Sequence, residues 1–184
     1  LLLPISLADR VTVEPSDMLT VSLEGPLAAE VPPDEANLAL RAAQVLAAEA
    51  GGADPPGAHI TIEKRIPVAA GLGGGSADAA ATLVLLDELW STGLGRDGLV
   101  PLGGAIGSDV PALLLGEPAY AHGRGELVAP VLVQPTTWVI KPFAFGVAST
   151  DAYAWWDEGG ATGPVPGALI AAAAGRPLHL MFPM

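Results

Sequence analysis

A glycine-rich segment between a short strand and an apolar helix constrains this chain more than any other feature. The segment from Ile60 to Trp90 reads ITIEKRIPVAAGLGGGSADAAATLVLLDELW, and four of the five residues that start at Gly71 are glycine. Alternating residues before the glycines predict a strand, and the apolar residues from Ser76 onward predict a helix that is buried on nearly all sides. Strand, glycine loop and helix N-terminus together present backbone N–H groups to an anion, so the segment predicts a phosphate-binding loop.

Three well-known glycine motifs do not fit this loop. A P-loop has Lys and then Ser or Thr after its last glycine, whereas Ser76 and Ala77 follow Gly75 here. A dinucleotide-binding motif needs a third glycine where Ser76 stands. The nucleophile elbow of hydrolases needs a glycine where Asp78 stands. A phosphate cradle of another type and a tight turn with small residues for packing both stay open at this point.

Composition limits the partners and the kinds of site. The 184 residues suffice for one large or two small domains, and 8 Lys and Arg against 20 Asp and Glu give a net charge of −12, which argues against nucleic-acid or anionic-membrane binding. No apolar run approaches the ~18 residues of a membrane span and no signal segment is recognisable, so a soluble cytoplasmic protein is expected. Without Cys and with only three His, thiolate and His-rich metal sites are excluded.

Periodicity predicts the other elements. Alternating apolar residues over 11–13 and 19–23 predict a hairpin or meander, and Asp34 is expected to be the N-cap of a helix over 37–50. Six glycines between 91 and 107 weaken any helix there. Further along, residues 128–140 predict a strand and residues 168–174 an Ala-rich helix.

Polar residues around the loop have local explanations as well as functional ones. Asn37 is either a helix cap or a ligand contact, and Lys64 is either a nucleotide contact or one of the basic residues that protect strand edges. Ser76 is either an ordinary cap or a hydroxyl for a phosphate oxygen or Mg²⁺. Asp78 is expected to face a cation, a backbone group or water. Asp109, followed by Pro111, is on sequence grounds alone most simply an N-cap.

The loop sequence closely resembles the ATP-binding motif of the GHMP kinases. The residues that carry the resemblance are IEKRIPVAAGLGGGSADAA and the later GSDVP, and the triple glycine with Ser-x-Asp-Ala-Ala is similar to the isoprenoid-pathway branch of that family. The resemblance implies an α+β GHMP kinase fold. A ribosomal protein S5 domain 2-like N-terminal domain, lacking its first strands, would occupy residues 1–132, and part of a ferredoxin-like C-terminal domain would occupy 133–184.

The resemblance also implies an activity. Enzymes of this branch transfer the γ-phosphoryl group of ATP, with Mg²⁺, to the 2-hydroxyl of a small-molecule substrate, a cytidylated methylerythritol. Two alternatives stay open: another small-molecule GHMP kinase, or a nucleotide-binding remnant without catalysis. The second is suggested because the family's Lys-x-Asn and Ser-Gly-Ser-Gly-Pro-like motifs have no counterpart in these residues.

Site residues follow from the resemblance position by position. Asp109 corresponds to the catalytic base, Tyr153 to the aromatic ring that stacks on cytosine, and Ser76 to a candidate Mg²⁺ ligand. Ala77 replaces a Ser that is common in the family, and Trp155 and Trp156 are expected in the core or at a pocket rim. The nucleotide is expected to contact the cap and loop residues: Asn37, Lys64, Pro67, Val68, Ala69, Ala70, Gly71, Leu72, Gly73, Gly74, Gly75, Ser76 and Ala77.

Overall fold

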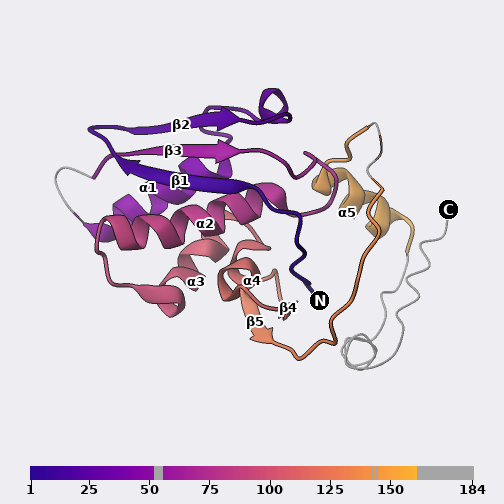
Figure 1. Cartoon of the computed structure of the whole chain (residues 1–184). Helices are drawn as coiled ribbons and strands as arrows, with labels where there is room; N and C mark the ends of the chain where they lie inside the picture. The colour runs from indigo at the N-terminus through magenta and orange to yellow at the C-terminus, as the bar shows by residue number, and fades with distance from the viewer. Residues whose placement is uncertain (52–55, 142, 144, 161–184) are drawn as a thin grey trace.

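The computed structural model describes residues 1–51, 56–141, 143 and 145–160. The helix expected over 168–174 lies outside these residues. Helices and strands are both present, and one three-stranded sheet lies over a layer of helices (Figure 1). No helix in the described part of the chain is both long and apolar enough to span a membrane.

The three-stranded sheet has β3 at its centre. Its strands are β1 (Arg10–Pro15), β2 (Leu19–Glu24) and β3 (Ala58–Glu63), in the order β1-β3-β2. β3 pairs antiparallel with β1 and parallel with β2, so the hairpin or meander expected from these two segments is wrong. The reason is burial: alternate residues of β3 are fully buried, whereas β1 and β2 are only partly buried and take the edges.

Two helices cover one face of the sheet, α1 (Leu38–Ala50) and α2 (Gly74–Leu89) (Figure 1). The cap of α1 is Asn37, whose Oδ1 accepts a hydrogen bond of 2.9 Å from Ala39 N. The predicted cap at Asp34 is wrong, because that carboxylate accepts from Ala36 N in the turn before the helix. A short 3-10 helix, η1 (Ala28–Glu30), precedes this turn.

Helix α2 is central, as its apolar sequence predicts. It contacts β1, α1 and two further helices, α3 (Gly95–Ile106) and α4 (Val110–Leu115). Leu83 and Leu86 are fully buried in the resulting core. The helix starts two residues before Ser76, after a left-handed Gly73 with φ 68°.

Helix α3 forms over 12 residues despite its glycines. A Cβ on Gly103 would lie 2.9 Å from Leu114 Cδ1 and 3.0 Å from Val110 Cγ1, both in α4. The missing side chain therefore lets α3 and α4 pack closely. Contacts between the helices outweigh the low helix propensity of glycine, which is why the expected weakening does not abolish the helix.

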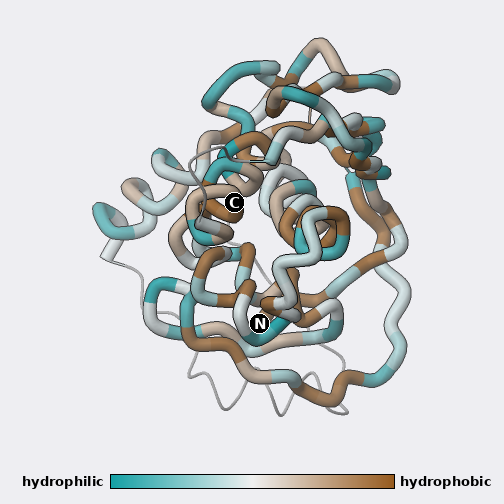
Figure 2. The backbone as a smooth tube through the Cα atoms, turned by 90° about the vertical axis from the view of Figure 1, so that its left-hand side faces the viewer, coloured by the Kyte–Doolittle hydropathy of each residue, from teal (hydrophilic) through white to brown (hydrophobic). Residues whose placement is uncertain are grey.

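The chain after α4 is only partly regular. A second, two-stranded antiparallel sheet consists of β4 (Ala119–His122) and β5 (Leu127–Pro130), so the strand expected over 128–140 ends ten residues early. Helix α5 (Ser149–Glu158) follows and has no buried residue. Hydrophobic stretches consequently occur on outer segments as well as in the central helices (Figure 2).

Asp87 organises the connection from α2 to α3. Its carboxylate accepts hydrogen bonds from Thr92 Oγ1, Leu94 N and Gly95 N. The Thr92 hydroxyl and these N–H groups hold the pKa of Asp87 below its usual value of 3.8. A lowered carboxylate pKa means that the ionised form stabilises the folded chain at pH values above about 4, and that this contribution is lost as the pH falls through the folded-state pKa.

We predict that Asp87→Ala lowers the free energy of unfolding at pH 7 by about 1–2 kcal/mol, comparable to the loss of a helix cap. Urea unfolding of the variant and the wild type between pH 2.5 and 7 measures this difference. The difference should be constant near neutrality and shrink below about pH 4, where the Asp87 carboxylate becomes protonated. A difference that does not change with pH would show that the carboxylate charge contributes nothing.

Candidate active site

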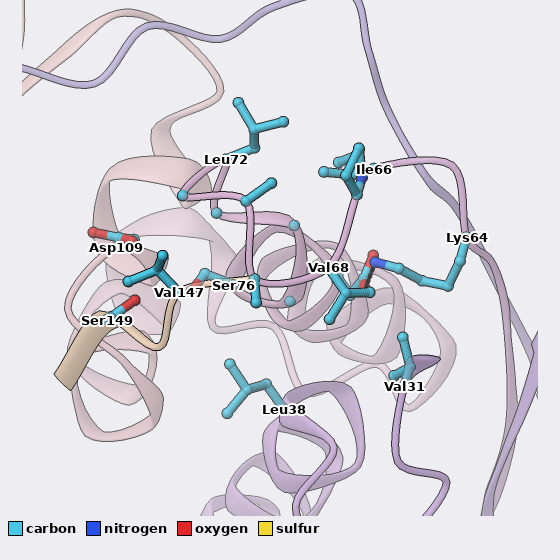
Figure 3. A pocket seen from close by; sticks show the side chains of 18 of the residues that line it. Val31, Leu38, Lys64, Ile66, Val68, Leu72, Ser76, Asp109, Val147 and Ser149 are labelled. Atoms are coloured by element: carbon cyan, nitrogen blue, oxygen red, sulfur yellow. Dashed lines mark hydrogen bonds and ion pairs between the residues drawn. The ribbon is translucent and has the colours of Figure 1, made fainter. Parts of the chain in front are cut away.

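A cavity of about 680 Å³ lies where the N-termini of α1, α2 and α5 approach the loop that follows β3. The predicted nucleotide contacts that line it are Asn37, Lys64, Pro67, Val68, Ala69, Ala70, Gly71, Leu72, Gly73, Gly74, Gly75 and Ser76. Ala77 is the exception, because it lines a separate groove between α2 and α4. Asp109 and Ser149 lie on one side of the cavity and Lys64 on the other in Figure 3, with Ser76 between them.

The backbone of the glycine loop forms a cradle at the start of α2. Ala69, Gly71 and Gly73 have φ values of 52°, 70° and 68°, so the chain winds in the left-handed sense three times before the helix begins. The first helical bond runs from Ala77 N to Gly73 O at 2.9 Å. N–H groups of the preceding helical residues therefore point out of the helix N-terminus into the cavity, where the helix dipole favours an anion.

Asp109 stands at the start of α4 without capping it. Asp109 occupies the N-cap position, but its side chain makes no capping hydrogen bond. The simple capping role expected from sequence alone is therefore wrong, because the backbone at Asp109 is already helical, with φ −90° and ψ −20°, whereas a capping residue normally has extended backbone. The carboxylate is left available to the cavity that it lines.

A second cavity of about 500 Å³ adjoins the first. Asp109, Tyr153 and the loop residues from Gly71 to Gly73 line both. The rest of its wall comes from the apolar segments 1–5, 112–113 and 138–140 and from one charged residue, Glu117. The N-terminal segment is held there by a backbone pairing of Leu2 with Ala119, at 2.8 and 3.0 Å. Asp109 and Tyr153 thus stand at the junction of two cavities of different character.

Tyr153 comes to this junction on α5. The helix begins at Ser149 and is preceded by a hydrogen bond of 3.0 Å from Val147 N to Ala69 O in the glycine loop. Tyr153 is 70% exposed, which leaves its ring free to contact a ligand. Of Trp155 and Trp156, only Trp156 lines the first cavity, so it is a rim residue. Neither of these two side chains belongs to the core.

Lys64 lines the first cavity, and its ammonium is already paired with two carboxylates. Its ammonium donates to Asp9 and, at 2.7 Å, to Asp78 Oδ2, and its side chain is 3% exposed. The expectation that Asp78 faces a cation is confirmed. Burial raises the pKa of Asp78 to about 6 against the opposing effect of Lys64. Burial would raise the pKa of Asp9 too, but hydrogen bonds from Arg65 N, Lys64 and Ile66 N outweigh it and lower that pKa.

Asp9 is the site residue that the sequence interpretation missed. It directly precedes β1, and the register pairs Arg10 with Glu63, so the residue before Arg10 lies opposite Lys64. The antiparallel pairing of β1 with β3 is the signal that identifies Asp9, and the expected hairpin concealed it. Asn37 was identified, but both of its polar groups have local partners, since Nδ2 donates to Pro32 O at 3.0 Å and Oδ1 caps α1.

Comparisons with known proteins agree on one family. The model for the GHMP kinases N terminal domain matches residues 37–117. A protein of Salinispora tropica named 4-diphosphocytidyl-2-C-methyl-D-erythritol kinase is 47% identical over 165 residues, which are 87% of this chain and 52% of the relative. A protein of Nocardia farcinica with the same name is 50% identical over 148 residues, 80% of this chain and 48% of the relative. The chain thus spans about half the length of the curated relatives it matches.

Solved structures lead to the same family. A crystal structure of 4-(cytidine 5'-diphospho)-2C-methyl-D-erythritol kinase has 43% sequence identity and a TM-score of 0.54, covering 70% of this chain and 44% of that chain. Homoserine kinase from Cytophaga hutchinsonii has a TM-score of 0.54 over 90% of this chain and 58% of that chain, and at 17% identity it supports the fold alone. With its glycine cradle and its α+β architecture, the chain belongs to the GHMP kinase family.

Proposed function

We propose that this chain is the nucleotide-binding part of a kinase that transfers the γ-phosphoryl group of ATP to the 2-hydroxyl of 4-diphosphocytidyl-2-C-methyl-D-erythritol. The observation that carries the proposal is the position of Asp109. Its carboxylate makes no capping hydrogen bond and lies where a glycine-lined cavity meets an apolar one. The names of the relatives support the choice of substrate.

The first cavity suits the triphosphate of ATP. Its loop carries backbone N–H groups on the N-terminus of a 16-residue helix, and glycines there leave room for phosphate oxygens. Asn37, Val31 and Leu38 line the wall formed by α1 and the turn before it, which we assign to the adenine ring. Phosphates would then lie along the loop toward Ser76 and Asp109.

The second cavity suits the acceptor. Its apolar wall fits the carbon skeleton and methyl group of a methylerythritol, and the exposed ring of Tyr153 offers a face on which cytosine can stack. Because Asp109 belongs to both cavities, an acceptor hydroxyl bound in the second would lie between that carboxylate and the phosphates in the first. This arrangement is the one that in-line transfer requires.

Asp109 would orient the hydroxyl and accept its proton. The γ-phosphorus of ATP then forms a bond to the acceptor oxygen as its bond to the β-phosphate oxygen breaks, and ADP leaves with the electron pair. Such a transition state is loose, so positioning and charge neutralisation matter more than a strong base.

Magnesium fits this site as a companion of the nucleotide. The described residues contain no group of three His, Cys, Asp or Glu side chains that could hold a metal ion alone. Ser76 and Asp109 do offer oxygen ligands on the cavity, and Mg²⁺ typically combines one or two protein oxygens with phosphates and waters. When bound, the ion would neutralise charge on the phosphates.

One observation favours a second candidate, nucleotide binding without turnover by this chain alone. Lys64 is the only cation lining the first cavity within the described residues, and two carboxylates already neutralise it. Phosphoryl transfer benefits strongly from a cation near the developing charge. Turnover is therefore tested in a protein that includes the further segments found in the longer relatives.

We predict that Gly75→Ala separates nucleotide binding from stability. Gly75 is helical and exposed, and a Cβ there would meet only Leu38 Cδ1 at 3.6 Å, so the fold tolerates it and the helix gains up to about 1 kcal/mol. The same methyl group would occupy space at the cradle, and ATP affinity should fall at least about tenfold. Titration calorimetry and thermal melts measure the two effects.

Gly104→Ala in α3 is the matched control for this experiment. Its Cβ would also make only ordinary contacts, at 3.8 and 3.9 Å, but Gly104 does not line the cavity. It should stabilise the helix and leave ATP affinity unchanged. Equal ATP affinities in the two variants would remove the cradle from the proposal.

A third prediction concerns Tyr153. Because α5 has no buried residue, Tyr153→Ala should leave the melting temperature unchanged. Base stacking on an aromatic side chain typically contributes ~1–3 kcal/mol, so affinity for the cytidylated substrate should fall by about 5–150-fold while ATP affinity stays constant. Tyr153→Phe, which keeps the ring, should bind like the wild type. Loss of both ligands would mean that Tyr153 supports the fold instead.

For Asp109 the structure makes two variants informative. Since the Asp109 side chain makes no capping hydrogen bond, Asp109→Ala should have the melting temperature of the wild type. Loss of a true cap lowers the free energy of unfolding by about 0.5–2 kcal/mol. Asp109→Asn keeps the shape but cannot accept a proton, and turnover of the longer protein should drop ~10²–10⁴-fold. Asp97→Asn, on the first turn of α3, is the control. Wild-type turnover in Asp109→Asn would refute the catalytic role.

A further inference from the structure

Three charged side chains meet beneath the glycine loop. Lys64 directly follows β3, Asp78 lies in the early part of α2, and Asp9 directly precedes β1. Lys64 Nζ contacts both carboxylates, and all three side chains are at most 5% exposed. We call this group the carboxylate clasp.

We propose that the carboxylate clasp positions the glycine loop for its ligand, and that Lys64 affects nucleotide binding through this role and not by contact with the phosphates. The first half of the proposal concerns the loop itself. The second half rests on the proposed function, because it assumes that the first cavity binds a nucleotide.

The clasp ties together the two ends of the loop. Lys64 stands directly before it and Asp78 follows it, so their hydrogen bond of 2.7 Å joins two residues that are 14 positions apart in the chain. Asp9 adds a second tie, since its Oδ1 accepts from Arg65 N at 2.5 Å and from Ile66 N at 2.8 Å. Entry to the loop and exit from it are thus fixed to one buried point.

The start of α2 packs directly on the clasp. A Cβ on Gly74 would lie 3.0 Å from Ile66 Cγ2 and 3.5 Å from Lys64 Nζ. Gly74 is the first residue of the helix whose N-terminus forms the cradle. A shift of Lys64 or Ile66 would therefore move the N–H groups that face the cavity.

Charge argues against a direct phosphate contact. With both carboxylates ionised, the clasp has one positive and two negative charges, which leaves a net charge of −1 and would repel a phosphate. The Lys64 ammonium is also enclosed, with a side chain 3% exposed. A lysine that recognises phosphate needs a free ammonium directed at the ligand.

The clasp is not optimised for stability, which favours a positioning role. Asp78 Oδ1 is buried and has no hydrogen-bond partner among the described residues. Buried ion pairs and triads can often be replaced by apolar side chains without loss of stability. Removing one charged partner, by contrast, leaves an unpaired buried charge and is strongly destabilising. This asymmetry provides a test, because a neutral clasp can keep the geometry without the charges.

The experiment compares Lys64→Met with a neutral triple variant, Asp9→Asn/Lys64→Met/Asp78→Leu. Asn at position 9 keeps an oxygen for Arg65 N and Ile66 N, and Leu matches the shape of Asp at position 78. Amide hydrogen exchange over residues 65–76 is measured without nucleotide, and ATP affinity is measured by calorimetry. Arg65→Met is the control, since the side chain of this neighbouring cation is exposed and, among the described residues, pairs only with Glu63, at 2.7 Å.

Lys64→Met should speed exchange across the loop at least about tenfold and weaken ATP at least about tenfold. The triple variant should restore both to within about threefold of the wild type, and Arg65→Met should change neither. Wild-type exchange rates in Lys64→Met would overturn the clasp. Restored loop protection with ATP affinity still low in the triple variant would show that Lys64 contacts the nucleotide, which overturns the second half.

A further variant covers the case in which Lys64→Met does not fold. Asp78→Asn leaves the pair of Lys64 with Asp9 intact and should speed exchange at the α2 end of the loop, but not at Arg65 and Ile66. An equal increase of the exchange rates at both ends of the loop in this variant would contradict the two-ended tie. If the exchange rates behave as stated but the wild type binds no ATP, the proposed function fails while the clasp stands.

Discussion

The burial of α2 between the three-stranded sheet and the other helices is the contact on which the rest of the structure depends. An amphipathic helix has one side to bury, but α2 is apolar nearly all round and requires neighbours on every side. The sheet, α1, α3 and α4 supply them. This enclosure leaves the N-terminus of α2 as the part of the helix that opens to a cavity, so the packing that stabilises the fold also directs the helix dipole at the site.

Glycines serve packing at some positions and access at others. Gly103 lets α3 approach α4, and Gly125, with φ 104°, lets the turn between β4 and β5 touch the loop before Asp109, since a Cβ there would lie 2.0 Å from Ser108 O. At Gly71 and Gly73, by contrast, no atom of the described residues lies within 4 Å of the Cβ position. Their left-handed backbone shapes the cradle, and the space around them is left for a ligand.

Sequence reasoning succeeded where one local pattern decides the outcome. The period of the apolar residues identified α1 and α2, and the Gly-rich loop identified the cradle between β3 and α2. It failed where distant segments decide. The central place of β3 depends on strands from two other parts of the chain, and Asp9 belongs to the site only because of that pairing. For Asp109 the residues alone suggested a capping role and the resemblance suggested a catalytic one, and the backbone geometry contradicts the first.

The site gathers groups that lie far apart in the sequence. Ser76 stands on α2, and a Cβ on Gly107 would lie 3.9 Å from its Oγ, so the loop that carries Asp109 passes close to the cradle. Tyr153 is tied to the same cradle through Val147 N and Ala69 O. The proposed base, the proposed phosphate cradle and the proposed stacking residue are thereby each connected to one loop. Phosphoryl transfer depends mainly on relative position, and an arrangement in which every group takes its position from that loop makes the loop's own support the determinant of alignment.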